Sequence, residues 1–267
     1  MFETAAEASG GEPKRDAMPT MGFLDHLEEL RRRLVYSIAA VAVGFFACWW
    51  KVEKIYDIMQ RPIMDALRAN GMSEKLVYLN PTEPFNLYLK ISALAGLFLT
   101  SPFVLYQVWM FISPGLYRNE KRYVVPFMVS TIALFSAGGY FGYRVVYPQA
   151  LGFLIHFGRQ FQPMITIGEY TSLFLSIILG MGLIFEMPIL IFFLSLMGIV
   201  SAGFMWKNFR YAILLIFIIA AIVTPTPDVL NMCIFAAPMV ALYGFSIGIA
   251  WLVHPKQRRA RKEKKAT

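Results

Sequence analysis

The stretch HLEELRRRLVYSIAAVAVGFFACWW, residues 26–50, joins a charged segment directly to an uninterrupted apolar run. The apolar part begins at Leu34 and approaches the ~20 residues that cross a bilayer as a helix. The chain as a whole has 267 residues, of which 57% are hydrophobic and 16% charged, and its mean hydropathy is +0.54. These values exclude an ordinary soluble domain and predict an all-α polytopic membrane protein.

Five further apolar runs follow the first one, so we predict six transmembrane helices. The run from Tyr211 to Val223 is the shortest, because its residues rise only ~20 Å against a hydrocarbon core of ~30 Å. The TPTPD sequence at 224–228 must turn the chain sharply between the last two runs. The segment from 51 to 84 is mixed in polarity but has apolar residues at helical spacing around Pro62, and it predicts a cap over the outer face. The predicted spans are Leu34–Trp50, Leu87–Ser113, Tyr123–Tyr147, Thr171–Val200, Tyr211–Val223 and Val229–Val253.

The basic residues predict how the chain is oriented. Of the 25 Lys and Arg residues, 17 fall on the side that would hold both termini, which the positive-inside rule makes cytoplasmic. We expect residues 1–20 to be a disordered cytoplasmic tail without a cleavable signal peptide, and residues 21–254 to be the membrane domain. Residues 255–267 form a basic cytoplasmic tail that would contact anionic lipids, and the positive charge is no argument for nucleic acid.

The sequence favours no enzyme class and no cofactor. His26, His156 and His254 fall at or near span ends, and no nucleophile motif, HExxH pair or aspartate dyad accompanies them. Cys48 and Cys233 lie inside apolar runs, where a packing role is expected instead of a disulfide or a metal site.

Two interpretations fit the acids at the start of the first helix. Glu28 with Arg32, and Glu29 with Arg33, have the i,i+4 spacing that stabilises a helix on its own. Alternatively, a carboxylate is held at the membrane surface to receive a positively charged ligand.

A second acid, Glu120, lies in the cytoplasmic segment SPFVLYQVWMFISPGLYRNEKR, residues 101–122. Alone it would be a counter-ion for its basic neighbours. Together with Glu29 it offers two separated carboxylates on one surface, each suited to a guanidinium group. A peptide with paired arginines would fit such a surface.

Glu186 is the third acid of interest, because it stands in the apolar run LGMGLIFEMPILIFF just ahead of Pro188. A carboxylate at this depth must face a cavity, find a polar partner or be protonated. It could serve as the coupling carboxylate of an ion- or proton-coupled small-solute transporter, which would require further polar groups facing it. Pro188 could open the helix locally for a partner.

Four blocks of this sequence resemble the TatC family, the multispanning receptor subunit of the twin-arginine protein translocase. They occur in family order from about Met21 to His254 and are HLEELRRRL, SPFVLYQVWMFISPGLYRNEKR, FEMP at 185–188 and TPTPD at 224–228. The resemblance implies a glove-shaped six-helix bundle with short fifth and sixth helices. It implies a receptor for signal peptides of folded proteins, dependent on the proton-motive force, in a bacterial inner membrane.

The resemblance also implies roles for individual residues. Glu29 and Glu120 match the acids that bind the peptide arginines, and Glu186 matches an acid on the concave intramembrane face. Arg31, Arg122 and Phe111 match neighbours of the binding patch, and Pro62 and Asp228 match outer-side positions linked to assembly or function.

One position departs from the family pattern. Met232 stands where members often carry Gln, at the contact with single-span TatA or TatB partners, so that contact could be arranged differently. The implied assembly is a homo-oligomer within a hetero-oligomeric complex.

Overall fold

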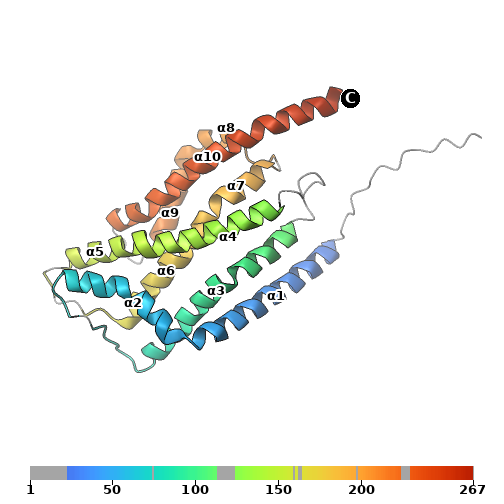
Figure 1. The fold of residues 1–267 in the computed structure, drawn as a ribbon. Helices are drawn as coiled ribbons and strands as arrows, with labels where there is room; N and C mark the ends of the chain where they lie inside the picture. Colours follow the sequence, from blue (N-terminus) through green and yellow to red (C-terminus); the bar gives the residue numbers. More distant parts are fainter. Residues whose placement is uncertain are drawn as a thin grey trace, which may run out of the picture.

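The computed structural model describes residues 23–73, 75–112, 124–158, 160–161, 164–196, 198–223 and 229–266, and over these ranges the protein is helical (Figure 1). A single isolated β-bridge, between Val77 and Thr166, is the only extended pairing among these residues. The helices are α1 (Phe23–Trp49), α2 (Val52–Ala69), α3 (Glu83–Ile112), α4 (Val124–Phe141), the π-helical η3 (Gly142–Val146), α5 (Tyr147–Phe157), α6 (Ile167–Phe185), α7 (Met187–Leu196), α8 (Ala202–Lys207), α9 (Phe209–Val223) and α10 (Val229–Ala266).

Among the described residues, five helical stretches are long and apolar enough to cross a membrane, and α9 supplies a shorter sixth. The five are His26–Trp49, Glu83–Phe111, Val125–Phe157, Ile167–Ser195 and Met232–Trp251. The predicted all-α polytopic class is therefore confirmed, including the short fifth run. The sixth run is the shortest of the five at 20 residues, but its helix continues to Ala266.

The helices run between two ends of the bundle (Figure 1). The "charged end" holds the start of α1 and the ends of α3 and α10, and the "cap end" holds α2. The charged HLEELRRRL segment belongs to the same helix as the first span, so its residues are fixed by the packing of α1 on α3. Helices α1 and α3 approach closely at Gly44 and Gly96, and neither position has room for a Cβ atom. A Cβ on Gly96, for example, would lie 2.6 Å from the backbone nitrogen of Phe45.

The third span is longer than predicted. It passes Tyr147 and continues through α5 to Phe157, where the sequence analysis ended it at Tyr147. The reason lies in η3, whose wider turn directly precedes α5 and leaves Pro148 in the first turn of α5, where a missing N–H is tolerated. The helix thus continues past a proline that would ordinarily interrupt it.

The fourth span is divided at the predicted place. Glu186 ends α6, its N–H donates to the Leu183 carbonyl at 3.1 Å, and α7 begins at Met187. The expectation that Pro188 opens this helix locally is confirmed.

The cap helix α2 packs onto the bundle through Met59, Ile63 and Leu67, which are buried. These three are among the apolar residues at helical spacing around Pro62 from which the cap was predicted, whereas Ile58, another of them, is 51% exposed. The main core continues inward from this cap through α3, α5 and α6. The cap predicted from the spacing around Pro62 is therefore a docked helix.

Candidate functional site

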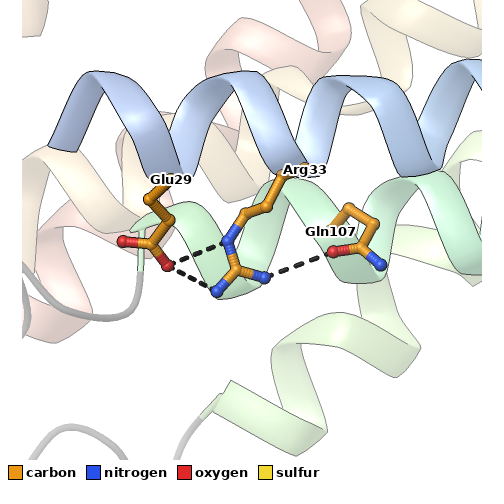
Figure 2. A network of polar contacts seen from close by, with 3 residues as sticks. All are labelled: Glu29, Arg33 and Gln107. Carbon is orange, nitrogen blue, oxygen red and sulfur yellow. Dashed lines mark hydrogen bonds and ion pairs between the residues drawn. The ribbon is translucent and has the colours of Figure 1, made fainter. Parts of the chain in front are cut away.

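A polar network joins α1 to α3 at the charged end (Figure 2). The Nε of Arg33 donates to Oε1 of Glu29 at 2.9 Å, and Nη2 of Arg33 donates to the same oxygen. Nη1 of Arg33 donates to Oε1 of Gln107 at 3.2 Å. The helix-stabilising pair predicted from the i,i+4 spacing of Glu29 and Arg33 is therefore present, and it is tied to a second helix.

Only one oxygen of the Glu29 carboxylate, Oε1, takes part in this network. Its side chain is 10% exposed, and Oε2 is buried without a hydrogen-bond partner among the described residues. Figure 2 shows this oxygen on the side away from Arg33. A buried carboxylate oxygen without a donor is costly, so the position can accept a further N–H group.

Beside this network the aromatic rings of His26 and Phe111 stack, with their centroids 4.5 Å apart. Phe111 belongs to the predicted binding patch, and the stack places it at the same end of α3 as Gln107. Arg31 is exposed on α1. The assignment of Glu29, Arg31 and Phe111 to a ligand-binding patch stays a prediction.

Of the other residues singled out in the sequence, some are described by the structure and some are not. Glu28 and Arg32 are both exposed and form no ion pair with each other, so the second i,i+4 pair expected in this helix is absent. Glu120, Arg122 and Asp228 lie outside the described residues, as does the TPTPD turn.

Glu186 lies partly buried at the break between α6 and α7, and its Oε1 is buried with no hydrogen-bond partner in the described ranges. The preceding residue, Phe185, takes part in the packing of α6 on α4, where its ring centroid lies 5.6 Å from that of Phe141. The further polar groups that a coupling carboxylate would need are not hydrogen-bonded to this oxygen.

Pro62 lies inside α2 and changes the hydrogen bonding of the cap. Because proline has no N–H, the carbonyl of Ile58 four residues earlier loses its helical donor. The hydroxyl of Tyr143, from η3, donates to this carbonyl at 2.6 Å. One residue further on, the hydroxyl of Tyr170, from α6, donates to the Met59 carbonyl at 2.6 Å.

Two other tyrosines near the cap, Tyr56 and Tyr147, have phenol groups that are partly or fully buried. Burial raises the pKa of Tyr56 on α2, with smaller contributions from Tyr88 and Asp57, so this phenol is neutral at physiological pH. Tyr147 is fully buried, and its hydroxyl has no hydrogen-bond partner in the part of the chain that the structure describes.

Met232 packs on the outside of the main core, at the start of α10. Its neighbours along the helix, Cys233 and Ile234, line an apolar cavity of about 680 Å³ between α10 and the third span. The cavity is also lined by Gln149. Among the described residues no group of three or more His, Cys, Asp or Glu side chains could hold a metal ion.

Sequence reasoning missed the connection between Arg33 and Gln107 and the two tyrosines at Pro62. The i,i+4 spacing identified the Glu29 partner, but Gln107 lies 74 residues from Arg33 and has no local signal. For the tyrosines, the one available signal was the carbonyl that Pro62 leaves free.

Comparison with known proteins identifies the family. The family model described as Sec-independent protein translocase protein (TatC) matches residues 25–238. A protein of that name from Koribacter versatilis is 66% identical over 249 residues, covering 93% of this chain and 92% of the relative. Its counterpart from Desulforapulum autotrophicum is 41% identical over 226 residues, covering 84% and 82% of the two chains.

Solved structures agree with the sequence comparison. A crystal structure of the twin-arginine translocase receptor TatC superimposes with a TM-score of 0.76 at 35% identity, covering 85% of this chain and 99% of that one. A second structure, of the receptor in the detergent DDM, gives a TM-score of 0.77 at the same identity, over 84% and 99% of the two chains. The family consists of membrane components of protein translocation and not of enzymes. This chain belongs to the TatC family of Sec-independent protein translocase proteins.

Proposed function

We propose that this protein recognises signal peptides with paired arginines at its charged end, with Glu29 accepting one guanidinium group and Glu120 the other. The observation that carries the proposal is the Oε2 of Glu29, which is buried and has no hydrogen-bond partner among the described residues. Glu29 is held by Arg33 of the same helix, which is itself bonded to Gln107 of α3, so its unused oxygen offers a positioned acceptor for a charged donor.

The surroundings of Glu29 suit a guanidinium group better than a lysine ammonium. The stacked rings of His26 and Phe111 supply a flat surface at the same end, and planar guanidinium groups pack well on aromatic faces. Arg31 is exposed nearby and would repel cations that lack a second carboxylate to bind. Two acids thus favour a ligand with two adjacent arginines.

The remaining parts of the proposal follow from the family and the charge distribution. Both termini face the cytoplasm of a bacterial inner membrane, with the basic C-terminal tail on anionic lipids. Bound cargo recruits single-span TatA- and TatB-type proteins to a complex that holds several copies of this chain, and Met232 lies at one such contact. Transport draws on the proton-motive force. Pro62 and Asp228 act in assembly on the outer side.

The transporter alternative receives no support from a specific observation. It requires a polar network around Glu186, whereas Oε1 of Glu186 has no hydrogen-bond partner among the described residues. The family to which the chain belongs is a protein translocase family.

Binding of a fluorescent signal peptide to the detergent-solubilised protein tests the proposal. Twin-arginine and twin-lysine forms of one peptide are compared on the wild type, Glu29→Gln, Glu120→Gln and the double variant. Glu28→Gln is the matched control, because Glu28 is an exposed acid on the same turn of α1.

We expect each single variant at Glu29 or Glu120 to lose arginine-selective binding by ~10- to 150-fold, since a hydrogen bond to a charged group contributes ~1.5–3 kcal/mol. The Glu28 control should bind like the wild type. Unchanged binding in the double variant would refute the receptor site at these two acids.

A further inference from the structure

Arg33 occupies the position at Glu29 that a ligand guanidinium would take. It is itself a guanidinium, and two of its N–H groups converge on a single oxygen of Glu29. The usual paired arrangement, with one N–H group to each oxygen, is left unformed. The ion pair is therefore satisfied on one oxygen only, and a guanidinium that reached both oxygens would bind the carboxylate better.

Burial explains why the unliganded site needs such an occupant. The side chains of Arg33 and Glu29 are 15% and 10% exposed, so an ionised Glu29 without a cation would carry a large desolvation penalty. Arg33 keeps the site electrically neutral in the absence of a ligand. Because Oε2 is buried, a ligand reaches the carboxylate only when neighbouring groups move.

Gln107 provides the place to which Arg33 can withdraw. Its side chain is 7% exposed, it comes from the facing helix α3, and its Oε1 already accepts from Nη1 of Arg33 at 3.2 Å. Figure 2 shows Arg33 between the two acceptors, with Glu29 on one side and Gln107 on the other. Since Gln107 is neutral, it holds Arg33 without competing with Glu29 for a full charge.

We propose that Arg33 is a resident competitor that sets the selectivity of this site for arginine. A ligand arginine displaces it from Glu29, and Arg33 is then retained by Gln107. A ligand lysine offers a compact ammonium group without the planar fork, so it competes poorly with an arginine that already makes two hydrogen bonds to Oε1. The inference rests on the proposed function, because it assumes that Glu29 receives a ligand cation.

The test compares twin-arginine and twin-lysine peptides on Arg33→Gln, with Arg32→Gln as the matched control. Arg32 is an exposed neighbour without an ion pair to Glu28, so its removal changes the same net charge. We expect Arg33→Gln to tighten lysine-peptide binding and to lower the arginine-to-lysine affinity ratio about tenfold relative to Arg32→Gln, the size of one moderate interaction. An unchanged ratio, or an equal loss for both peptides, would overturn the inference.

A second variant keeps Arg33 and guards against misfolding of the first. In Gln107→Glu the new carboxylate competes with Glu29 for Arg33 and frees Glu29 for the ligand. We expect tighter binding of both peptides and again a lower ratio. A ratio equal to or above that of the wild type would contradict the exchange.

Glu29→Gln in the same assay separates the two levels of the argument. If this variant still selects arginine, the proposed site itself fails. If it loses selectivity while Arg33→Gln and Gln107→Glu keep the wild-type ratio, only the competitor role of Arg33 fails.

Discussion

The charged end and the cap end of this bundle both join distant helices through polar side chains, but they do so with opposite chemistry. At the cap, two neutral tyrosine hydroxyls donate to carbonyls of α2, and each bond is 2.6 Å long. At the charged end, the ion pair of Glu29 and Arg33 reaches across to one neutral amide, and one Glu29 oxygen has no donor among the described residues.

The difference indicates what each end is for. Neutral hydrogen bonds with short distances fix a helix in place and leave little for a ligand to gain. A charged pair with an unused oxygen is more costly to bury and binds an added cation more strongly. Mutations at the cap end should therefore change the stability of the protein, whereas mutations at the charged end should change the affinity for the ligand.

The largest difference in peptide affinity is expected between the Glu29→Gln and Tyr170→Phe variants. The first should weaken arginine-peptide binding by ~10-fold or more, because it removes the charge that the ligand meets. The second should leave peptide affinity within about twofold of the wild type, since Tyr170 lies at the opposite end. Peptide titrations on both variants check this, and equal losses of affinity would break the comparison.

Glu186→Leu extends the comparison to a third polar group, whose Oε1 has neither an ion-pair nor a hydrogen-bond partner among the described residues. Glu186 is partly buried and its Oε1 has no partner among the described residues, so replacing this carboxylate by an apolar side chain of similar size should stabilise the protein by ~1–3 kcal/mol. Thermal unfolding in detergent should show a higher midpoint than the wild type. A lower midpoint would mean that Glu186 is satisfied by groups outside the described residues.

At the cap, Tyr170→Phe and Tyr147→Phe form a matched pair of hydroxyl deletions. Tyr170 donates to the buried Met59 carbonyl, so its deletion should lower the free energy of unfolding by about 1 kcal/mol. The Tyr147 hydroxyl makes no hydrogen bond of good geometry within the described ranges and has the Tyr170 ring beside it, so its deletion should cost less than that of Tyr170. Thermal or denaturant unfolding distinguishes the two, and equal losses would refute the assignment.

The smallest effect is expected for the coupling between Pro62 and Tyr143. Tyr143→Phe leaves the Ile58 carbonyl without either donor, at a cost of about 0.5–1.5 kcal/mol. In the Pro62→Ala background the new N–H can bond to that carbonyl, so the same deletion should cost less. A double-mutant cycle of unfolding free energies measures the difference, and additive effects would show that the tyrosine does not replace the missing N–H.

The sequence predicted those parts of the fold that depend on local pattern. The apolar runs and the helical spacing around Pro62 gave the spans and the cap, and the spacing of Glu29 and Arg33 gave their ion pair. Where three-dimensional packing decides, prediction was wrong or silent. The third span passes Pro148 because of the π-helical turn before it, which no local pattern announces.

The candidate site was predicted in part for the same reason. Glu29 was singled out from its local sequence pattern and Phe111 from the family resemblance, and the structure places both where the start of α1 meets the end of α3. Gln107 could not be assigned because its role depends on the crossing of two helices far apart in sequence. The exposed acid Glu28 shows the converse, since it has the same spacing to an arginine as Glu29 but forms no pair with Arg32.

The most direct test of the account is a solid-state NMR distance between a peptide guanidinium and the Glu29 carboxylate. A twin-arginine peptide carrying ¹⁵N guanidinium groups is bound to protein carrying ¹³C glutamate. The spectrum of the Glu29→Gln variant, recorded at a peptide concentration that saturates this weaker binder, is subtracted to isolate the one carboxyl carbon. The account predicts a nitrogen-to-carbon separation of ~3.5–4 Å, as expected for charge-assisted hydrogen bonds of ~2.8 Å. No measurable dipolar coupling at Glu29, while the peptide is bound, would contradict it.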